Sequence, residues 1–118
     1  MKKFIQNAIK KKAHKLIAEH KPIVIAVTGS VGKTSARVAV ATVLSEKFRV
    51  RTTYKNYNNE FGVPLTILGA KSPGRSVFGW LKILLSNPKD FPEVLVLEYA
   101  IDRPGDMKYL CEIARPNI

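Results

Sequence analysis

The residues AVTGSVGKTS, at positions 26–35, have the types and the spacing that phosphate binding requires. Gly29 and Gly32 allow backbone turns that a side chain would obstruct, so consecutive N–H groups can face an anion. Lys33 would neutralise the charge of β- and γ-phosphates, and Thr34 would place a hydroxyl group on Mg²⁺. The sequence therefore predicts a nucleotide-binding loop.

The loop departs from the general GxxxxGK[ST] pattern, because Val27 stands where that pattern has a glycine. The alternative is an ordinary strand-to-helix turn that happens to contain Gly-Lys. The context favours phosphate binding, since a short apolar run precedes the loop and helical spacing follows it. The predicted nucleotide-binding residues of the loop are Thr28, Gly29, Ser30, Val31, Gly32, Lys33, Thr34 and Ser35.

Glu98 lies near the end of the otherwise apolar run LVLEY, at positions 95–99. A carboxylate in such a run is costly unless it is paired or bound to a cation. Because Mg²⁺ prefers oxygen ligands together with phosphate, Glu98 is a candidate magnesium ligand that faces the loop. The alternative is a carboxylate that emerges into solvent where the strand ends.

A third polar segment, KNYNNEFG at positions 55–62, offers amide groups at Asn56, Asn58 and Asn59. These amides could contact phosphate, metal-bound water or a substrate. The alternative is a polar turn that the Asn side chains stabilise. The residue types alone leave both interpretations open.

Three segments have the composition of strands, and segments with helical spacing alternate with them. This order predicts an α/β fold with a parallel sheet of the P-loop type and helices on both faces. Ligands bind at the carboxyl ends of the strands in such sheets, where the loop, the Asn-rich segment and Glu98 all fall. The expected strands are 23–27, 49–54 and 93–99, and the expected helices are 2–20, 33–47, 64–68, 77–85 and 104–115.

Some positions carry more detailed expectations. The first strand is expected to be buried on both faces, as in a parallel sheet. Val40, Val43 and Leu44 are available for the buried face of the helix 33–47. Asp102 is a candidate cap for the last helix. A further strand is expected to start at the last residues of the chain.

The charge is more informative than the rest of the composition. The length of 118 residues suits one domain with a real core, and 46% of the residues are hydrophobic. Twenty Lys and Arg against nine Asp and Glu give a net charge of +11, which suits a nucleotide, a nucleic acid or an anionic membrane surface. No aromatic–basic nucleic-acid motif is present, so nucleic acid is the least favoured of these partners. No apolar run reaches the roughly 18 to 20 residues of a membrane span.

Three motifs together resemble the ATP-binding central domain of the Mur ligase family. The motifs are TGSVGKTS at 28–35, NYNNEFGVPLTIL at 56–68 and LVLEYAIDRPGDMKYLCEIARPNI at 95–118. The resemblance covers about residues 23–118 with the motifs in the family's order. It implies that residues 22–118 form the N-terminal part of a central domain, preceded by a basic amphipathic helix at 1–21. The family's loop reads TGxxGK[ST], which accounts for Val27.

The resemblance implies an ATP-dependent ligase of peptidoglycan precursor synthesis. In the family, ATP phosphorylates a substrate carboxylate, and an amine attacks the acyl phosphate to form an amide. By position, Lys33 resembles the phosphate-binding lysine, and Thr34 and Glu98 resemble the two Mg²⁺ ligands. Lys33 and Glu98 are thus the implied catalytic residues. Asn58 and Asn59 fall on the family's Asn-rich loop beside nucleotide and metal.

The chain also departs from the family. Members often have glycine two residues after the strand-end glutamate, whereas EYA places Tyr99 and Ala100 after Glu98. A separate N-terminal domain, the later metal-site residues and the C-terminal domain have no counterpart in these 118 residues. We therefore expect the first half of a central domain that does not ligate by itself.

The implied partners are ATP, Mg²⁺, a UDP-muramoyl-peptide-like substrate and an amino acid or dipeptide. A cytoplasmic location is expected, with peripheral attachment at the inner face of the membrane as a further hypothesis. Another Mur-type ligase or a Mur-like amidotransferase subunit is the alternative among enzymes. A non-catalytic nucleotide-binding module is the alternative outside them.

The N-terminal segment 2–21 contains seven lysines and one glutamate. The default interpretation is a solvated helix face. The alternative is attachment to an anionic membrane surface. A second contact would come from Trp80, Leu81, Ile83, Leu84 and Leu85, although core packing is favoured for these residues. The N-terminal side chains that would enter the membrane are Phe4, Ile5, Ile9 and Leu16.

Overall fold

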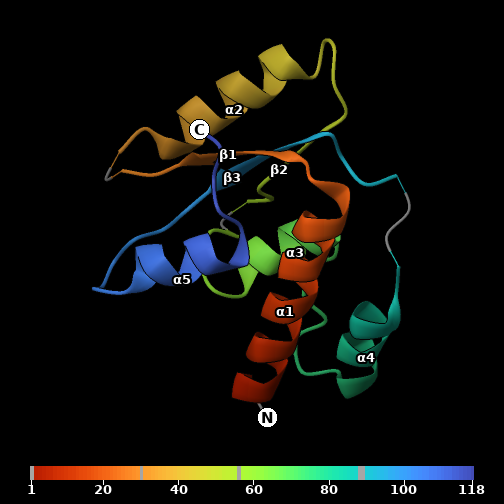
Figure 1. Ribbon diagram of the computed structural model, residues 1–118. Helices are drawn as coiled ribbons and strands as arrows, with labels where there is room; N and C mark the ends of the chain where they lie inside the picture. Colours follow the sequence, from red (N-terminus) through yellow and green to blue (C-terminus); the bar gives the residue numbers. More distant parts are fainter. Residues whose placement is uncertain (1, 30, 56, 88–89) are drawn as a thin grey trace.

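The computed structural model describes residues 2–29, 31–55, 57–87 and 90–118 (Figure 1). Along these residues the order is α1 (Lys2–His20), β1 (Ile23–Val27), α2 (Lys33–Leu44), β2 (Val50–Thr52), α3 (Gly62–Leu68), α4 (Val77–Leu85), β3 (Val94–Glu98) and α5 (Asp106–Ile113). Every expected strand and helix is present, and the bounds differ by a few residues.

The three strands form a parallel sheet in the order β1-β3-β2. On one side of β3, Val27 pairs with Glu98. On the other side, Val50 of β2 pairs with Val94. The carboxyl ends of parallel strands lie at one edge of the sheet, so the segments after β1, β2 and β3 begin at that edge. The predicted fold class is confirmed.

Helices cover both faces of the sheet (Figure 1). α2 packs on one face, where Ala41 clusters with Val94 and Val96. α1, α3 and α5 pack on the other face, where Leu95 and Leu97 belong to the larger core. Successive strand residues point to opposite faces, so β3 supplies apolar side chains to both layers. This position explains why the first four residues of β3, Val94–Leu97, are all apolar.

β1 is less buried than predicted. Val24 is buried, Ile23 is exposed and the other three residues are half-buried. The strand lies at one edge of the sheet, beside the last residues of the chain. The Val24 carbonyl accepts a hydrogen bond from the Asn117 N–H at 2.7 Å, and the Ala26 N–H donates to the Ile118 carbonyl at 3.1 Å. The last residues thus hydrogen-bond to β1 where a further strand was expected, although residues 115–118 form no strand.

The basic helix α1 is part of the same core. Ile5, Ile9, Ala13 and Leu16 are buried, and α1 packs against α3, α4 and α5. The hypothesis that Ile5, Ile9 and Leu16 enter a membrane is therefore wrong, because protein encloses these side chains. Phe4, the other residue of that set, is exposed. In the described part of the chain no helix, α1 included, combines the length and apolarity needed to cross a membrane.

Two detailed expectations are wrong. Val43 is 70% exposed, and Ala41 lies on the buried face of α2 instead. Asp102 does not cap α5. The carboxylate of Asp106 accepts hydrogen bonds from the N–H groups of Asp102 and Arg103, both at 2.9 Å. These bonds lower the pKa of Asp106 and fix the turn before the helix.

Tyr99 connects the end of β3 to the end of α5. Its side chain is fully buried, and its hydroxyl group donates a hydrogen bond to the Ala114 carbonyl. Burial raises the pKa of this hydroxyl group above that of a solvated tyrosine. The two elements are therefore joined by a hydrogen bond in an apolar environment.

We expect Tyr99→Phe to lower the free energy of unfolding by about 1–2 kcal/mol, because the Ala114 carbonyl loses its partner. In the wild type, the unfolded chain loses the phenol proton at lower pH than the folded chain. The tyrosine's contribution is therefore complete below about pH 10 and falls as the pH rises further. Urea unfolding should show that, from neutral to alkaline pH, the free energy of unfolding falls less for Tyr99→Phe than for the wild type. The control is Tyr54→Phe, because Tyr54 is exposed. Equal stability of the wild type and Tyr99→Phe would contradict a stabilising role for the Tyr99 hydroxyl group.

Candidate functional site

The loop between β1 and α2 has the backbone that its glycines predict. Gly29 has φ 139° and Gly32 has φ 78°, values that glycine adopts far more readily than other residues. A Cβ atom added at Gly32 would meet no atom within 4 Å, so this glycine is required by conformation and not by space. Ser30, which belongs to the predicted binding set, lies outside the described residues.

Gly32 leads directly into α2, a helix of 12 residues. N–H groups in the first turn of a helix have no partners within the helix, and the helix dipole adds a partial positive charge. Half-buried Lys33 brings a full charge to this end, while Thr28, Val31 and Ser35 are exposed around it. The geometry therefore suits an anion such as a phosphate group.

Thr34 and Glu98 come together as the Mg²⁺ hypothesis requires. Thr34 Oγ1 donates a hydrogen bond to Glu98 Oε1 at 3.1 Å. Thr34 lies in the first turn of α2, and Glu98 is the last residue of β3. The alternative that Glu98 emerges into solvent is wrong, because this residue is only 2% exposed.

A buried arginine that the sequence analysis missed lies beside the same carboxylate. Arg37 Nε is 3.8 Å from Glu98 Oε2, and both side chains are less than a tenth exposed. The guanidinium group donates to the Thr53 carbonyl at 2.8 Å and to the Thr52 hydroxyl at 3.3 Å. Within the described residues, Nε itself has no hydrogen-bond partner. The available signal was a charged residue one helical turn after Lys33.

Further hydrogen bonds fix the end of β3. The Glu98 N–H donates to Thr53 Oγ1 at 2.9 Å. The Tyr99 N–H donates to the Val27 carbonyl at 2.9 Å, and the Thr28 hydroxyl donates to the Tyr99 carbonyl at 2.9 Å. The backbone on each side of the Glu98 side chain is thus held by neighbouring strands and loops. The carboxylate consequently has a defined position.

Ala100 stands where the family often has glycine, and the structure shows how it is accommodated. Its φ is not positive, so the backbone there does not require glycine. Its N–H donates to the Asn58 carbonyl at 2.8 Å. This bond joins the Asn-rich segment to the end of β3.

Asn59 has a structural role in that segment. Its side-chain oxygen accepts a hydrogen bond from the Gly62 N–H at 2.9 Å, at the start of α3. Gly62 is needed because a Cβ atom there would lie 2.3 Å from Tyr57 Cα. The interpretation of Asn59 as a turn-stabilising residue is thus confirmed. Nucleotide or metal binding by Asn58 and Asn59 stays a prediction, and Asn56 lies outside the described residues.

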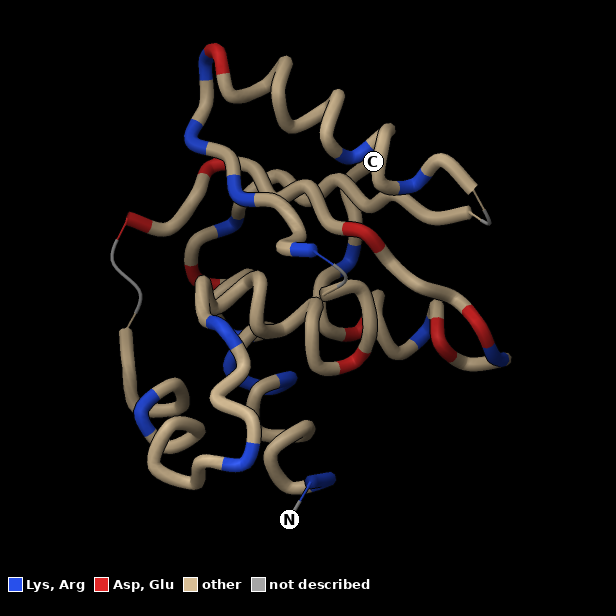
Figure 2. The backbone as a smooth tube through the Cα atoms, turned by 180° about the vertical axis from the view of Figure 1, so that it is seen from behind, with Lys and Arg blue, Asp and Glu red and all other residues tan. Residues whose placement is uncertain are grey.

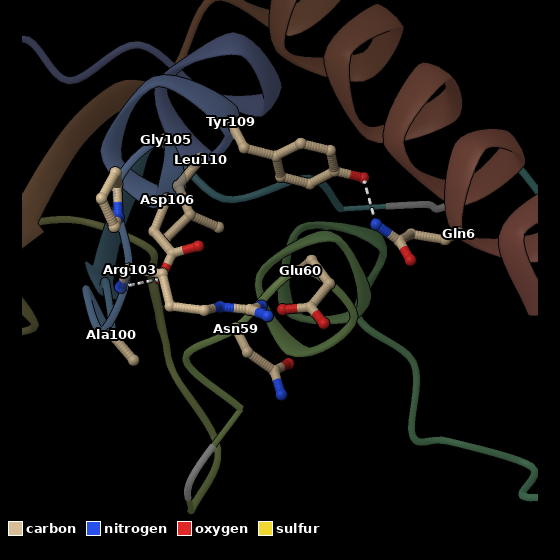
Figure 3. A pocket seen from close by; sticks show the side chains of 10 residues that line it. Gln6, Asn59, Glu60, Ala100, Arg103, Gly105, Asp106, Tyr109 and Leu110 are labelled. Carbon is tan, nitrogen blue, oxygen red and sulfur yellow. Dashed lines mark hydrogen bonds between the residues drawn. The ribbon is translucent and has the colours of Figure 1, made fainter.

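A cavity of about 460 Å³ is lined by residues of α1, of the Asn-rich segment before α3, of the loop after β3 and of α5 (Figure 3). Ala100 forms part of its wall, two residues beyond the end of β3. Glu60 and Arg103 bring opposite charges to the lining. The Gln6 side-chain amide donates to the Tyr109 hydroxyl at 2.9 Å and thereby joins α1 to α5. Such a lining suits a small polar or charged group.

The described residues contain no group of three His, Cys, Asp or Glu side chains that could hold a metal ion. Mg²⁺, however, commonly takes one or two protein oxygens and completes its coordination with phosphate and water. The neighbouring oxygens of Thr34 and Glu98 fit that requirement. Arg37 lies against the other carboxylate oxygen and leaves Oε1 on the side of Thr34.

Comparison with known proteins finds the same family that the sequence motifs indicate. A family model described as the Mur ligase middle domain matches residues 27–118. Two curated relatives are UDP-N-acetylmuramoyl-tripeptide–D-alanyl-D-alanine ligases. The one from Synechocystis sp. is 39% identical over 95 residues, and the one from Bacillus subtilis is 33% identical over 94 residues. The motifs of this chain also resemble this type of family member, so the relatives agree with the resemblance.

Solved structures of members of this family also have a fold similar to that of this chain. The MurF ligase from Thermotoga maritima in complex with ADP has a TM-score of 0.70 and 34% identity over 94% of the chain. The MurF structure from Acinetobacter baumannii has a TM-score of 0.72 at 23% identity, which supports the fold alone. The two curated matches cover 80% of this chain but only 17% of each relative. The Thermotoga match covers 22% of that protein.

We expect Arg37→Met to lower the free energy of unfolding by about 3 kcal/mol, because it leaves the buried Glu98 carboxylate without its cation. Arg37→Lys should lose less, since it keeps the charge without the planar guanidinium group. Urea unfolding followed by circular dichroism measures both changes.

The matched control is Arg49→Met, because the ion pair of Arg49 with Glu93 is largely exposed. This control should cost less than about 1 kcal/mol. Equal losses for Arg37→Met and Arg49→Met would show that the buried position adds nothing.

Proposed function

The chain belongs to the Mur ligase family, and on this premise we propose that it forms the ATP- and Mg²⁺-binding part of a ligase of peptidoglycan precursor synthesis. The curated relatives named above support a UDP-muramoyl-peptide-like substrate as the source of the carboxylate. They support an amino acid or dipeptide as the source of the amine. The observation that carries the proposal is the contact of Thr34 with Glu98 beside the glycine loop.

Phosphate binding would use the loop backbone and the first turn of α2. The positive φ values of Gly29 and Gly32 shape the loop, and the unpaired N–H groups of the helix end attract anions. Lys33 would add a charge-assisted contact to the terminal phosphates. The presence of ADP in the similar Thermotoga MurF structure supports a nucleotide as the ligand.

Magnesium would be held by one oxygen from Thr34 and one from Glu98. Arg37 would act as a positioning residue, because it lies against the far side of the Glu98 carboxylate and limits its rotation. When bound, Mg²⁺-ATP would supply the phosphoryl group that activates a substrate carboxylate for attack by an amine. Phosphoryl transfer depends on charge neutralisation and positioning, which fixed side chains of this kind provide.

The cavity beside the Asn-rich segment is the proposed approach for the substrate. Its wall includes Ala100, close in sequence to Glu98. The guanidinium group of Arg103 suits a carboxylate, and the carboxylate of Glu60 suits an ammonium group. Asn58 and Asn59 would lie between this cavity and the nucleotide. The supply of ATP makes the cytoplasm the proposed location of the reaction.

Isothermal titration calorimetry of the purified chain tests the nucleotide site. We expect ATP to bind more tightly with Mg²⁺ than without it. Lys33→Ala should weaken binding at least about tenfold, because a charged hydrogen bond to phosphate is lost. Glu98→Ala should weaken binding and reduce its dependence on Mg²⁺. Failure of the folded wild-type chain to bind Mg²⁺-ATP would contradict the proposal.

Two further variants separate binding from folding. Lys47→Ala removes an exposed charge in the turn after α2 and should leave ATP binding unchanged. Glu98→Gln keeps the shape of the buried side chain while it removes the negative charge beside Arg37. Circular dichroism establishes that each variant is folded, so a loss of affinity can be assigned to the site.

A further inference from the structure

Helix α4 is fixed to the domain by one of its sides. Trp80 is buried, and its indole N–H donates a hydrogen bond to the Gly74 carbonyl at 3.0 Å. The Trp80 and Phe61 rings pack with their centroids 6.2 Å apart. At the helix start, the Ser76 hydroxyl oxygen accepts from the Gly79 N–H at 3.0 Å. These contacts determine which side of α4 faces outward.

The outward side of α4 is apolar. Val77, Phe78, Leu81 and Leu85 are 49%, 85%, 46% and 79% exposed. With 3.6 residues per turn, these four positions fall within a sector of about 100° on the helix surface. Figure 1 shows α4 at the periphery of the molecule, away from the sheet. Single exposed apolar residues are ordinary, but a stripe along one helix indicates a contact surface.

Basic side chains lie on α4 and on the segments beside it. Lys82 lies on α4 itself and is exposed. Lys12 of α1 donates a hydrogen bond to the Leu84 carbonyl near the end of α4, at 2.7 Å. Lys2 and Arg75 line a cavity on the inner side of α4. Together with the stripe, Lys12 and Lys82 form what we call the docking face.

The two segments that build the docking face contain no acidic residue. Residues 2–18 and 61–89 hold ten Lys and Arg and no Asp or Glu. In Figure 2, α4 and the loop before it carry blue segments and no red ones. Most of the net charge of +11 therefore comes from the part of the chain that also exposes the apolar stripe.

We propose that the docking face attaches the protein to the surface of an anionic lipid bilayer. The apolar stripe would enter the boundary between headgroups and acyl chains, and the lysines of the docking face would lie at the level of the lipid phosphates. The contact keeps only the second part of the one considered from sequence, because α4 supplies the apolar side chains and the apolar side of α1 stays in the core. The core packing favoured from sequence holds for Trp80 but is wrong for the exposed Leu81 and Leu85.

The combination of apolar stripe and acid-free surroundings favours lipid over other partners. A nucleic acid would use the cations but would leave the four apolar side chains of α4 without a role. A second copy of the chain would bring two basic faces together, which like-charge repulsion opposes. An anionic bilayer uses both features.

Vesicle flotation tests the proposal with the full chain. We expect it to float with vesicles of phosphatidylcholine containing about 30% phosphatidylglycerol, to dissociate at high salt and to stay free of pure phosphatidylcholine. Phe78→Ser and Leu85→Ser should each weaken binding about tenfold, because an inserted apolar side chain is lost. Lys82→Glu should weaken it at least about fivefold.

The matched control is Val43→Ser, because Val43 is 70% exposed on α2, which covers the other face of the sheet. This variant should bind vesicles like the wild type. A folded chain that does not float with anionic vesicles would overturn the proposal, as would binding unaffected by Phe78→Ser and Leu85→Ser. Salt-sensitive RNA binding without vesicle binding would assign the cations to nucleic acid. A dimer that Phe78→Ser dissociates, again without vesicle binding, would assign α4 to a second copy.

Discussion

The buried carboxylate of Glu98 at the end of β3 is the constraint on which the site depends. An ionised group in that position is costly without a partner, and Arg37 of α2 provides one. Arg37 can reach Glu98 only if α2 lies on the sheet in one register. That register also places Thr34 against the same carboxylate and brings Gly32 and the helix end to the carboxyl edge of the sheet. Electrostatic compensation of Glu98 and the position of the glycine loop therefore have one structural cause.

The end of β3 is also held by hydrogen bonds from the segments on both sides of it. Thr53, after β2, accepts from the Glu98 N–H, while Val27 and Thr28 bond the backbone of Tyr99 from the β1 side. The buried Tyr99 hydroxyl then joins this edge to the last turn of α5. Segments that are distant in sequence thus lie around the Glu98 carboxylate. Their hydrogen bonds restrict the movement of this carboxylate.

The apolar residues and the lysines of α1 lie on different sides of the helix and have different roles. Its apolar side is buried in the core. Its lysines lie at the surface, where Lys12 contacts α4 and Lys10 pairs with Glu112. The same helix thereby stabilises the core on the side of the sheet opposite to α2 and contributes charge to the docking face. α4 behaves similarly, since Trp80 faces inward and Phe78 faces outward.

The sequence by itself determined the strands, the helices, the glycine loop and the pairing of Thr34 with Glu98 at one edge of a parallel sheet. Those features follow from local periodicity and from a topology in which all strands point the same way. The tertiary structure alone decided that Arg37 is buried beside Glu98 and that α4 rather than α1 exposes an apolar stripe. Each of these depends on which side of an element meets another element. The side chains allow several such contacts, and packing against residues far away in the chain selects one.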